Sequence, residues 1–241
     1  MTPHEAFFAL YEGLDRQGPG SRASLDWALG LAGVGPSARL LDAGCGPGAD
    51  VAGLLAWVPQ GRVVALDRHG PFIDRMRARF AAEGRVEARQ GDMAAPEGAF
   101  DLIWAAGSVY VLGVAAALAA WRGHLAPGGR VAFSQLAWRG GARPKPAAAF
   151  WAAAYPAMTE AEGVLEDVAA AGYRSLGRRW LSAADWAAYY EPLAARCVAL
   201  RPEAERDGAL AGAIAAAEAE IATWRAAGDS YGYLLCVVAP E

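Results

Sequence analysis

The chain lacks several features that mark proteins of nucleic acids, of secretion and of metal centres. Lys145 is the single lysine among 241 residues and the net charge is −4, so no basic stripe is available for a phosphate backbone. The three cysteines (Cys45, Cys197 and Cys236) are widely separated and form no C-x-x-C pair. We therefore expect no nucleic-acid partner, no disulfide framework and no metal site.

Long hydrophobic runs are also missing. No segment is apolar for long enough to span a bilayer, and residues 1–16 mix charged and apolar side chains without the basic start and apolar core of a secretory signal. These absences favour a cytoplasmic protein that is a monomer or a homodimer.

The sequence does contain a regular alternation of short apolar runs and longer helical stretches. The runs that predict strands cover residues 39–43, 62–66, 86–90, 100–104 and 130–133. Five strands with helical crossovers predict an α/β fold with a doubly wound, mostly parallel sheet. Ligands of such sheets bind at the carboxyl ends of the strands.

The pattern changes after residue 133. Helical stretches at 147–155 and 160–171 precede a strand at 173–181, and a last strand is predicted at 231–239. Residues 182–228 between these strands read as a helical insertion that can cap a pocket. We expect one domain over residues 1–241, divided into a helical cap (1–37), a cofactor-binding core (38–136) and a C-terminal half (137–241).

A glycine-rich loop follows the first predicted strand. Asp42 is succeeded by Gly44, Gly46 and Gly48, and a helix is predicted from residue 49 to 57. Glycines here allow sharp turns and a close approach of the backbone to a ligand, which is typical of a nucleotide-cofactor loop. Gly44, Gly46 and Ala49 also satisfy the dinucleotide pattern G-x-G-x-x-G/A, so the glycines alone leave an NAD(P) enzyme open.

Two further acids follow strands. Asp67 ends the second strand, nineteen positions after Gly48, where a carboxylate can accept both hydroxyls of a ribose. Asp92 follows the third strand within Gly91-Asp92-Met93, where it can accept an adenine amine while Met93 supplies an apolar wall. The dinucleotide pattern has no counterpart of Asp92.

In order and spacing, five segments resemble the class I S-adenosylmethionine-dependent methyltransferases. These segments are Asp42-x-Gly-x-Gly-x-Gly, Asp67, Gly91-Asp92, Phe100-Asp101-Leu102-Ile103 and Leu125-Ala126-Pro127-Gly128-Gly129. The resemblance implies a Rossmann-like, seven-stranded sheet with an antiparallel last strand. It also implies in-line methyl transfer from S-adenosyl-L-methionine to a small-molecule acceptor, which leaves S-adenosyl-L-homocysteine.

The resemblance also assigns cofactor contacts. Asp42 would orient the loop and the cofactor, and Gly44, Gly46 and Gly48 would approach its methionine moiety. The remaining assigned positions follow the second and third strands: Asp67 would take the ribose, and Asp92 and Met93 would frame the adenine. Arg68, next to Asp67, is a further candidate for cofactor binding.

Residues 15–21, 104–110 and 150–156 look like a bacterial branch near the ubiquinone/menaquinone-type methyltransferases. Within the first of these segments, Arg16 and Gln17 are candidates for binding the cofactor carboxylate or an acidic substrate group, unless they form a solvated turn.

Gly107, Ser108 and Tyr110 follow the fourth strand, where the transferred methyl group is expected. Gly107 is a candidate cofactor contact, and Ser108 and Tyr110 are candidates for orienting the acceptor. Alternatively, Gly107 only permits a turn and Tyr110 only packs. No residue qualifies as a general base on spacing, and the three histidines are expected at the surface.

Three functions therefore remain open from the residues alone: a methyltransferase, an NAD(P)-dependent oxidoreductase, and a noncatalytic protein that binds S-adenosylmethionine.

Overall fold

The computed structural model describes all residues from Met1 to Glu241 and places seven strands in one sheet of order β3-β2-β1-β4-β5-β7-β6. The strands are β1 (Arg39–Ala43), β2 (Arg62–Asp67), β3 (Val86–Gln90), β4 (Phe100–Ala106), β5 (Leu125–Trp138), β6 (Tyr173–Trp180) and β7 (Tyr231–Pro240). β1 to β5 pair in parallel, whereas β7 runs antiparallel to both β5 and β6. The predicted mostly parallel sheet with an antiparallel last strand is confirmed.

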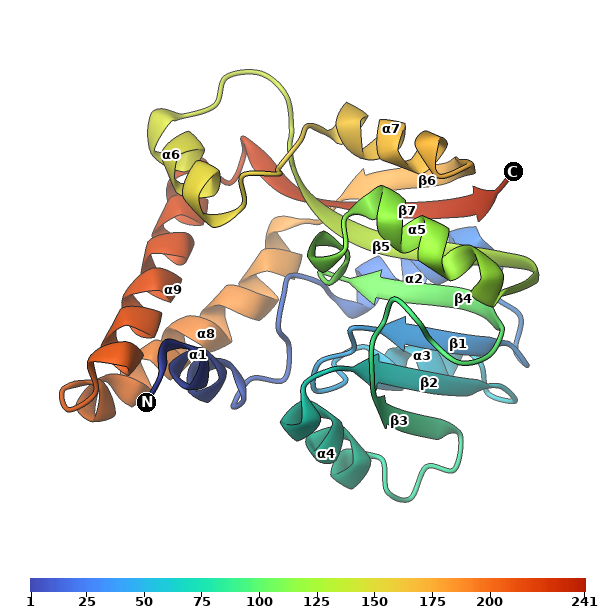
Figure 1. Ribbon diagram of the computed structural model, residues 1–241, viewed down its shortest axis with the longest axis horizontal. Coiled ribbons are helices and arrows are strands. Elements are labelled where there is room, and N and C mark those ends of the chain that lie inside the picture. The colour runs from blue at the N-terminus through green and yellow to red at the C-terminus, as the bar shows by residue number, and fades with distance from the viewer.

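Helices cover both faces of the sheet and one of its ends (Figure 1). They are α1 (Pro3–Tyr11), α2 (Arg22–Ala32), α3 (Val51–Trp57), α4 (Gly70–Arg79), α5 (Val114–Trp121), α6 (Lys145–Ala154), α7 (Ala161–Ala170), α8 (Ala183–Ala204) and α9 (Gly208–Ala227), with short 3-10 turns η1 (Val109–Val111) and η2 (Arg122–His124). In Figure 1, α5 and α7 lie on one face of the sheet, and α1, α6, α8 and α9 lie beyond the end at which β1, β2 and β4 finish.

The fifth strand is longer than the sequence predicts. It runs from Leu125 to Trp138 rather than from 130 to 133, because Leu125 already pairs with Phe100 of β4 and β7 pairs with the strand from Val131 to Trp138. Other strands supply these hydrogen bonds, so the local apolar pattern does not reveal them. Gly128 takes a φ of 79°, which permits the predicted turn at Pro127-Gly128-Gly129 that leads into the paired part of the strand.

The predicted insertion at 182–228 consists of α8 and α9. α8 begins with a capping box in which Ser182 and Asp185 satisfy each other's backbone N–H groups, and Asp207 caps α9. α1 packs on both helices through a buried apolar cluster that includes Leu10, Leu193 and Ile214. The first residues of the chain and the insertion thus form a single helical cap.

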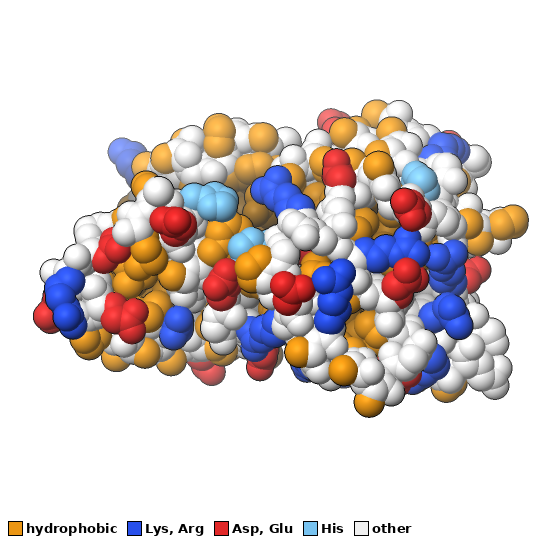
Figure 2. Space-filling view, turned by 60° about the horizontal axis from the view of Figure 1, so that its bottom comes forward, with side chains coloured by type: hydrophobic (Ala, Val, Ile, Leu, Met, Phe, Trp, Pro, Cys, Tyr) orange, Lys and Arg blue, Asp and Glu red, His pale blue; other side chains and the backbone are white.

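None of the helices combines the length and the apolar character needed to cross a membrane. On the face shown in Figure 2, positive and negative side chains are interspersed, with hydrophobic side chains between them.

Candidate active site

A cavity of about 790 Å³ lies between the cap and the carboxyl ends of β1, β2, β3 and β4. Its lining includes all but one of the predicted site residues: Arg16, Gln17, Asp42, Gly44, Gly46, Asp67, Arg68, Asp92, Met93, Gly107, Ser108 and Tyr110. Only Gly48 does not line it. The cavity has the size of a typical small-molecule site.

The glycine loop is shaped by its position against neighbouring strands. Gly44 and Gly46 adopt left-handed φ angles of 75° and 52°, and the N–H of Gly44 donates to the Leu66 carbonyl at 2.8 Å. A Cβ at Gly44 would lie 2.5 Å from the Cβ of Ser108. Only glycine therefore allows the ends of β1 and β4 to come this close.

Gly48 serves packing rather than the cavity. Its φ is 85°, and a Cβ there would lie 2.3 Å from the sulfur of Met76 on α4. Residue 48 is glycine because Met76 of α4 fills the space that a side chain would need. The predicted helix also begins at Val51 rather than at residue 49, which leaves Asp50 at its N-cap position without a capping hydrogen bond.

Asp67 joins the end of β2 to the glycine loop. One carboxylate oxygen accepts the N–H of Gly46 at 2.9 Å, and the other accepts the N–H of His69 at 2.8 Å. Each oxygen of a carboxylate can accept a second hydrogen bond. Asp67 is partly exposed to the cavity, so it keeps the capacity to bind ligand hydroxyl groups.

Asp42 is buried beside other carboxylates. Its side chain forms no hydrogen bond within the protein, although only 3% of the residue is exposed. Burial chiefly, and then the charges of Asp50 and Asp67, raise the pKa of Asp42 well above its usual range, while Arg16 opposes this rise. The part of the cavity next to Asp42 therefore favours a ligand with a positively charged group.

Arg16 and Gln17 form a packed turn rather than a solvated one. The guanidinium of Arg16 pairs with Asp50, which also accepts the indole N–H of Trp104 at 3.0 Å. Gln17 donates to the Tyr11 carbonyl at 2.9 Å, and its Cγ would lie 3.2 Å from a Cβ at Gly46. The two side chains hold the turn over the glycine loop.

Asp92, Met93 and Arg68 lie around another part of the cavity. Asp92 is exposed and accepts the N–H of Ala94 at 2.8 Å. The carbonyl of Met93 accepts the indole N–H of Trp121 at 2.6 Å, which fixes the Met93 backbone. Arg68 is exposed and forms no ion pair.

Of the three candidate residues after β4, two form hydrogen bonds within the protein and one has an accessible side chain. Ser108 donates its hydroxyl hydrogen to the Ala43 carbonyl at 2.7 Å, and the N–H of Gly107 donates to Ser134 at 2.9 Å. Tyr110 is 49% exposed and meets the ring of Tyr155 edge-on, with centroids 6.0 Å apart. Tyr110 therefore has the more available hydroxyl.

His69 does not lie in an open surface position as the sequence predicts. It stacks on Phe8 of α1 with ring centroids 3.7 Å apart, and its Nε2 lies 3.0 Å from a carboxylate oxygen of Glu12. Its side chain is 17% exposed and lines the cavity. Sequence spacing could not place it there because its partners come from the cap.

The cavity has an aromatic end that sequence reasoning only partly predicts. Its walls come from α1, η1, α6, α8 and β7, and its rings are Tyr11, Tyr110, Trp151, Tyr155, Trp186, Tyr189 and Tyr233. Glu220 of α9 joins them and accepts the hydroxyl hydrogen of Tyr190 at 2.8 Å. In the sequence, Glu220 stands three residues after Ala217 and four before Trp224, on the buried side of an alanine-rich helix. This spacing is the one local signal that could have identified Glu220 as a site residue.

Comparison with known proteins gives one family match, and the matched segment includes the glycine loop and strand ends that line the cavity. Residues 40–129 match the model of the family described as a methyltransferase domain. This segment contains Asp42, the glycine loop, Asp67, Asp92 and Gly107. No curated protein matches the chain.

Solved structures of the same fold cover the whole chain. A SAM-dependent methyltransferase from Geobacter sulfurreducens has a TM-score of 0.82 at 17% identity and 98% coverage of both chains. One from Thiobacillus denitrificans has a TM-score of 0.82 at 18% identity and 100% coverage of both. Both contain S-adenosyl-L-homocysteine.

The [4+2]-cyclase SpnF also has this fold, with a TM-score of 0.73, 18% identity, and coverage of 98% of this chain and 92% of that chain. The fold is therefore the Rossmann-like fold of methyltransferases, which also supports a different reaction.

Proposed function

We propose that the protein is an S-adenosylmethionine-dependent methyltransferase that acts on a small-molecule acceptor. The observation that carries this proposal is one cavity with two chemically different ends. The first end has the glycine loop and carboxylates at the strand ends, within the segment that matches the methyltransferase-domain family. The second end is aromatic. Gly107 lies between them, with Tyr233 4.0 Å from the position of its absent Cβ.

The residues of the first end fit this cofactor. Asp67 retains accepting capacity for the ribose hydroxyls, and Asp92 and Met93 lie where adenine would need an acceptor and an apolar wall. Asp42 is a buried carboxyl group next to the loop, and burial raises its pKa, so a cationic group of S-adenosylmethionine beside it would favour its ionised form and be held by it.

When bound, the cofactor supplies a methyl group activated by the positive sulfur. The protein has to align the acceptor and keep water away. The cap helices and the aromatic walls keep water away, since α1, α8 and α9 close the cavity on the side away from the sheet. Tyr110 remains the candidate for orienting the acceptor, because the Ser108 hydroxyl is bonded to the backbone of β1.

An NAD(P)-dependent oxidoreductase fits less well. At the glycine loop the cation Arg16 is already paired with Asp50, so it is not free to hold a pyrophosphate. The sheet also ends in an antiparallel β7 inserted between β5 and β6, whereas the dinucleotide-binding sheet has the order 3-2-1-4-5-6.

A protein that binds the cofactor without transferring its methyl group is the second candidate. The cyclase SpnF favours it, because that protein shares the fold and is described as catalysing a cyclisation. The resemblance to the ubiquinone/menaquinone-type branch remains a prediction, and so does the division of the chain at residues 37 and 136.

The test has two stages. Thermal melting with S-adenosylhomocysteine, S-adenosylmethionine, NAD⁺ and NADH compares the cofactors, and a ligand at about 100 times its Kd stabilises by about 2.7 kcal/mol. Incubation with methyl-labelled S-adenosylmethionine and a small-molecule extract then measures transfer. Stabilisation by the sulfur nucleotides alone with label in a small product supports a methyltransferase. Stabilisation without label supports the second candidate.

A further inference from the structure

Glu220 gives the aromatic end of the cavity its chemical character. It lies on α9 and lines the cavity with rings from five other parts of the chain. One carboxylate oxygen accepts the Tyr190 hydroxyl hydrogen at 2.8 Å, and Glu220 takes part in no ion pair. A carboxylate taken out of water without a cationic partner is costly, so the site favours a ligand that supplies one.

The positively charged residues that line the cavity are Arg16, His69 and Arg68. Arg16 pairs with Asp50, and His69 lies against Glu12. Arg68 extends from the end of β2, beside the residue assigned to the ribose. None of these three groups forms an ion pair with Glu220. A ligand beside Glu220 therefore meets a carboxyl group that has no cationic partner within the protein.

The tyrosines around Glu220 show that it lies in a region of low polarity. Burial and, to a smaller extent, the charge of Glu220 raise the pKa of Tyr11 to about 12. Burial also raises the pKa of Glu220 itself, and the hydrogen bond from Tyr190 opposes this rise. Electrostatic attraction is stronger in such surroundings than in water.

Aromatic rings favour cations at their faces. Trp186 lies 5.5 Å from Tyr233 and 5.3 Å from Tyr190 between ring centroids, so packed rings connect Gly107 with Tyr190, whose hydroxyl donates to Glu220. Of these rings, Trp186 and Tyr233 line the cavity. An ammonium group is attracted to such faces as well as to a carboxylate. A carboxylate next to aromatic rings is a common arrangement for holding an amine.

Part of the exposed lining of the cavity is apolar. Phe7, Tyr110 and Val111 line the cavity and are each about half exposed, at 49%, 49% and 46%. These side chains can contact an apolar body attached to the amine. The lining thus combines exposed apolar side chains with the carboxyl group of Glu220.

We propose that the aromatic end binds an amine with an apolar body, whose protonated nitrogen is held by the carboxylate of Glu220. The role of this ligand as the methyl acceptor rests on the proposed function, but its binding does not. Glu220 is then a substrate-binding residue, whichever atom of the ligand is methylated.

Three matched probes test the charge preference: 2-phenylethylamine, 2-phenylethanol and phenylacetate, each titrated by calorimetry into the protein saturated with S-adenosylhomocysteine. We expect the amine to bind at least about tenfold more tightly than the alcohol, which is the effect of one charge-assisted hydrogen bond. Phenylacetate should bind most weakly. Equal or tighter binding of the alcohol or the acid, or no binding of the amine at millimolar concentration, overturns the proposal.

Two variants locate the site. Glu220→Gln keeps the size of the side chain and should abolish the preference for the amine over the alcohol. Glu218→Gln removes a carboxylate from the same helix that pairs with Arg201 outside the cavity, and should leave the preference unchanged. An unchanged preference in Glu220→Gln, or an equal loss in both variants, contradicts the assignment.

Titration of S-adenosylhomocysteine into both variants separates this inference from the proposed function. Unaltered binding shows that the variants are folded and that the cofactor end is intact. If the wild-type protein binds no S-adenosylhomocysteine, the proposed function fails, and the amine titration repeated on the unliganded protein still decides the role of Glu220.

Discussion

The carboxylate of Asp67 accepts the backbone N–H of Gly46 at 2.9 Å, so the end of β2 is tied directly to the loop that follows β1. The same carboxylate accepts the N–H of His69 at the start of α4. One acidic side chain therefore holds two ligand-lining segments in place and still faces the cavity.

Replacement of Asp67 by alanine should weaken the binding of S-adenosylhomocysteine by about 1–3 kcal/mol, because charge-assisted hydrogen bonds to the ribose are lost. Calorimetric titration measures the change. Asp74→Ala is the control, since Asp74 lies on α4 with a 75% exposed side chain and pairs only with Arg77. Wild-type affinity in Asp67→Ala would show that the ribose assignment is wrong.

Asp42→Asn should stabilise the unliganded protein while weakening cofactor binding. The pKa of Asp42 is raised in the folded state, so its contribution to stability is present below its ordinary pKa of 3.8 and is lost as the pH rises through the folded value. The melting temperatures of variant and wild type should therefore be similar near pH 4, and the variant should melt higher at pH 8. A shift of about 2–4 °C corresponds to roughly 1 kcal/mol for a chain of this size.

Asp26→Asn is a suitable control for this experiment because Asp26 is partly exposed and its pKa is lowered, chiefly by the indole N–H of Trp57. Its effect with pH should have the opposite sign. A lower melting temperature of Asp42→Asn at pH 8 would contradict the account of the buried carboxylates.

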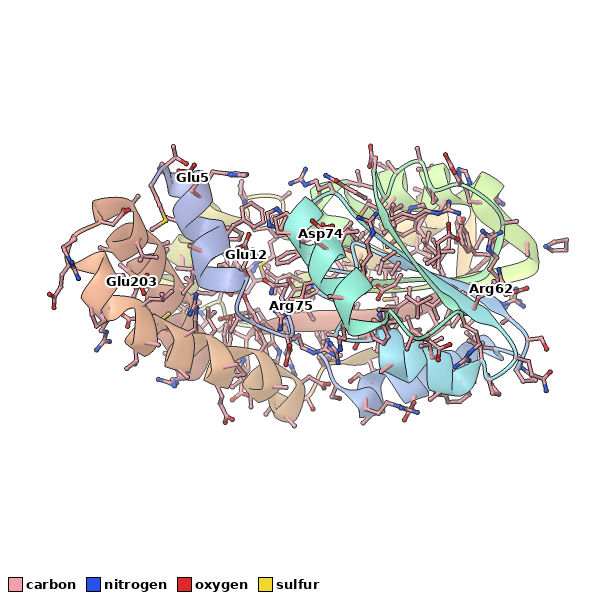
Figure 3. All side chains as sticks on the ribbon, turned by 90° about the horizontal axis from the view of Figure 1, so that it is seen from below. Glu5, Glu12, Arg62, Asp74, Arg75 and Glu203 are labelled. Atoms are coloured by element: carbon pink, nitrogen blue, oxygen red, sulfur yellow. The ribbon has the colours of Figure 1, made fainter.

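Arg75 fastens the segment after α1 to α4. It donates to the carbonyls of Glu12 and Leu14, each at 2.7 Å, and pairs with Asp15. Figure 3 shows Arg75 on the side of α4 that faces the end of α1, near Glu12. Since this segment leads to Arg16 and Gln17, its position decides how the cavity is closed.

Arg75→Ala should thus increase amide hydrogen exchange in residues 8–17 and weaken the binding of S-adenosylhomocysteine, with little change in the exchange of β1 and β4. Arg77→Ala, which removes an exposed ion pair on the same helix, should change neither. Unaltered exchange in Arg75→Ala would mean that the contacts of α1 with α8 and α9 suffice to hold it.

Gly48→Ala should destabilise the protein by roughly 1–3 kcal/mol, because the added Cβ would meet the Met76 sulfur and the φ of 85° disfavours alanine. Urea unfolding measures the loss. Gly84→Ala is the matched control, since no atom lies within 4 Å of the Cβ that it would add. If the loss in Gly48→Ala is no larger than in this control, the loop can move away from α4.

The sequence predicts the sheet better than it predicts the cavity. Strands 39–43 and 86–90 coincide with β1 and β3, because short apolar runs between helical stretches are a local signal. Asp67 and Asp92 follow their strands as predicted, since parallel strands bring their carboxyl ends to one edge.

The remaining site residues depend on contacts between distant segments. Phe8 meets His69 only after α1 packs on the insertion, and Glu220 lines the same cavity as Tyr11 and Tyr233 because three separate elements converge there. No local periodicity encodes such meetings. The acid at 220 on the buried side of α9 is the one signal that the sequence carries, and an alanine-rich helix conceals it.

Calorimetric titration of the wild-type protein with S-adenosylhomocysteine and NADH in parallel tests the central claim most directly. We expect micromolar binding of S-adenosylhomocysteine, no binding of NADH, and weaker binding of S-adenosylhomocysteine in both Asp42→Ala and Asp67→Ala. Binding of NADH in place of the sulfur nucleotide, or binding of neither, would contradict the methyltransferase proposal and require another ligand for the glycine loop.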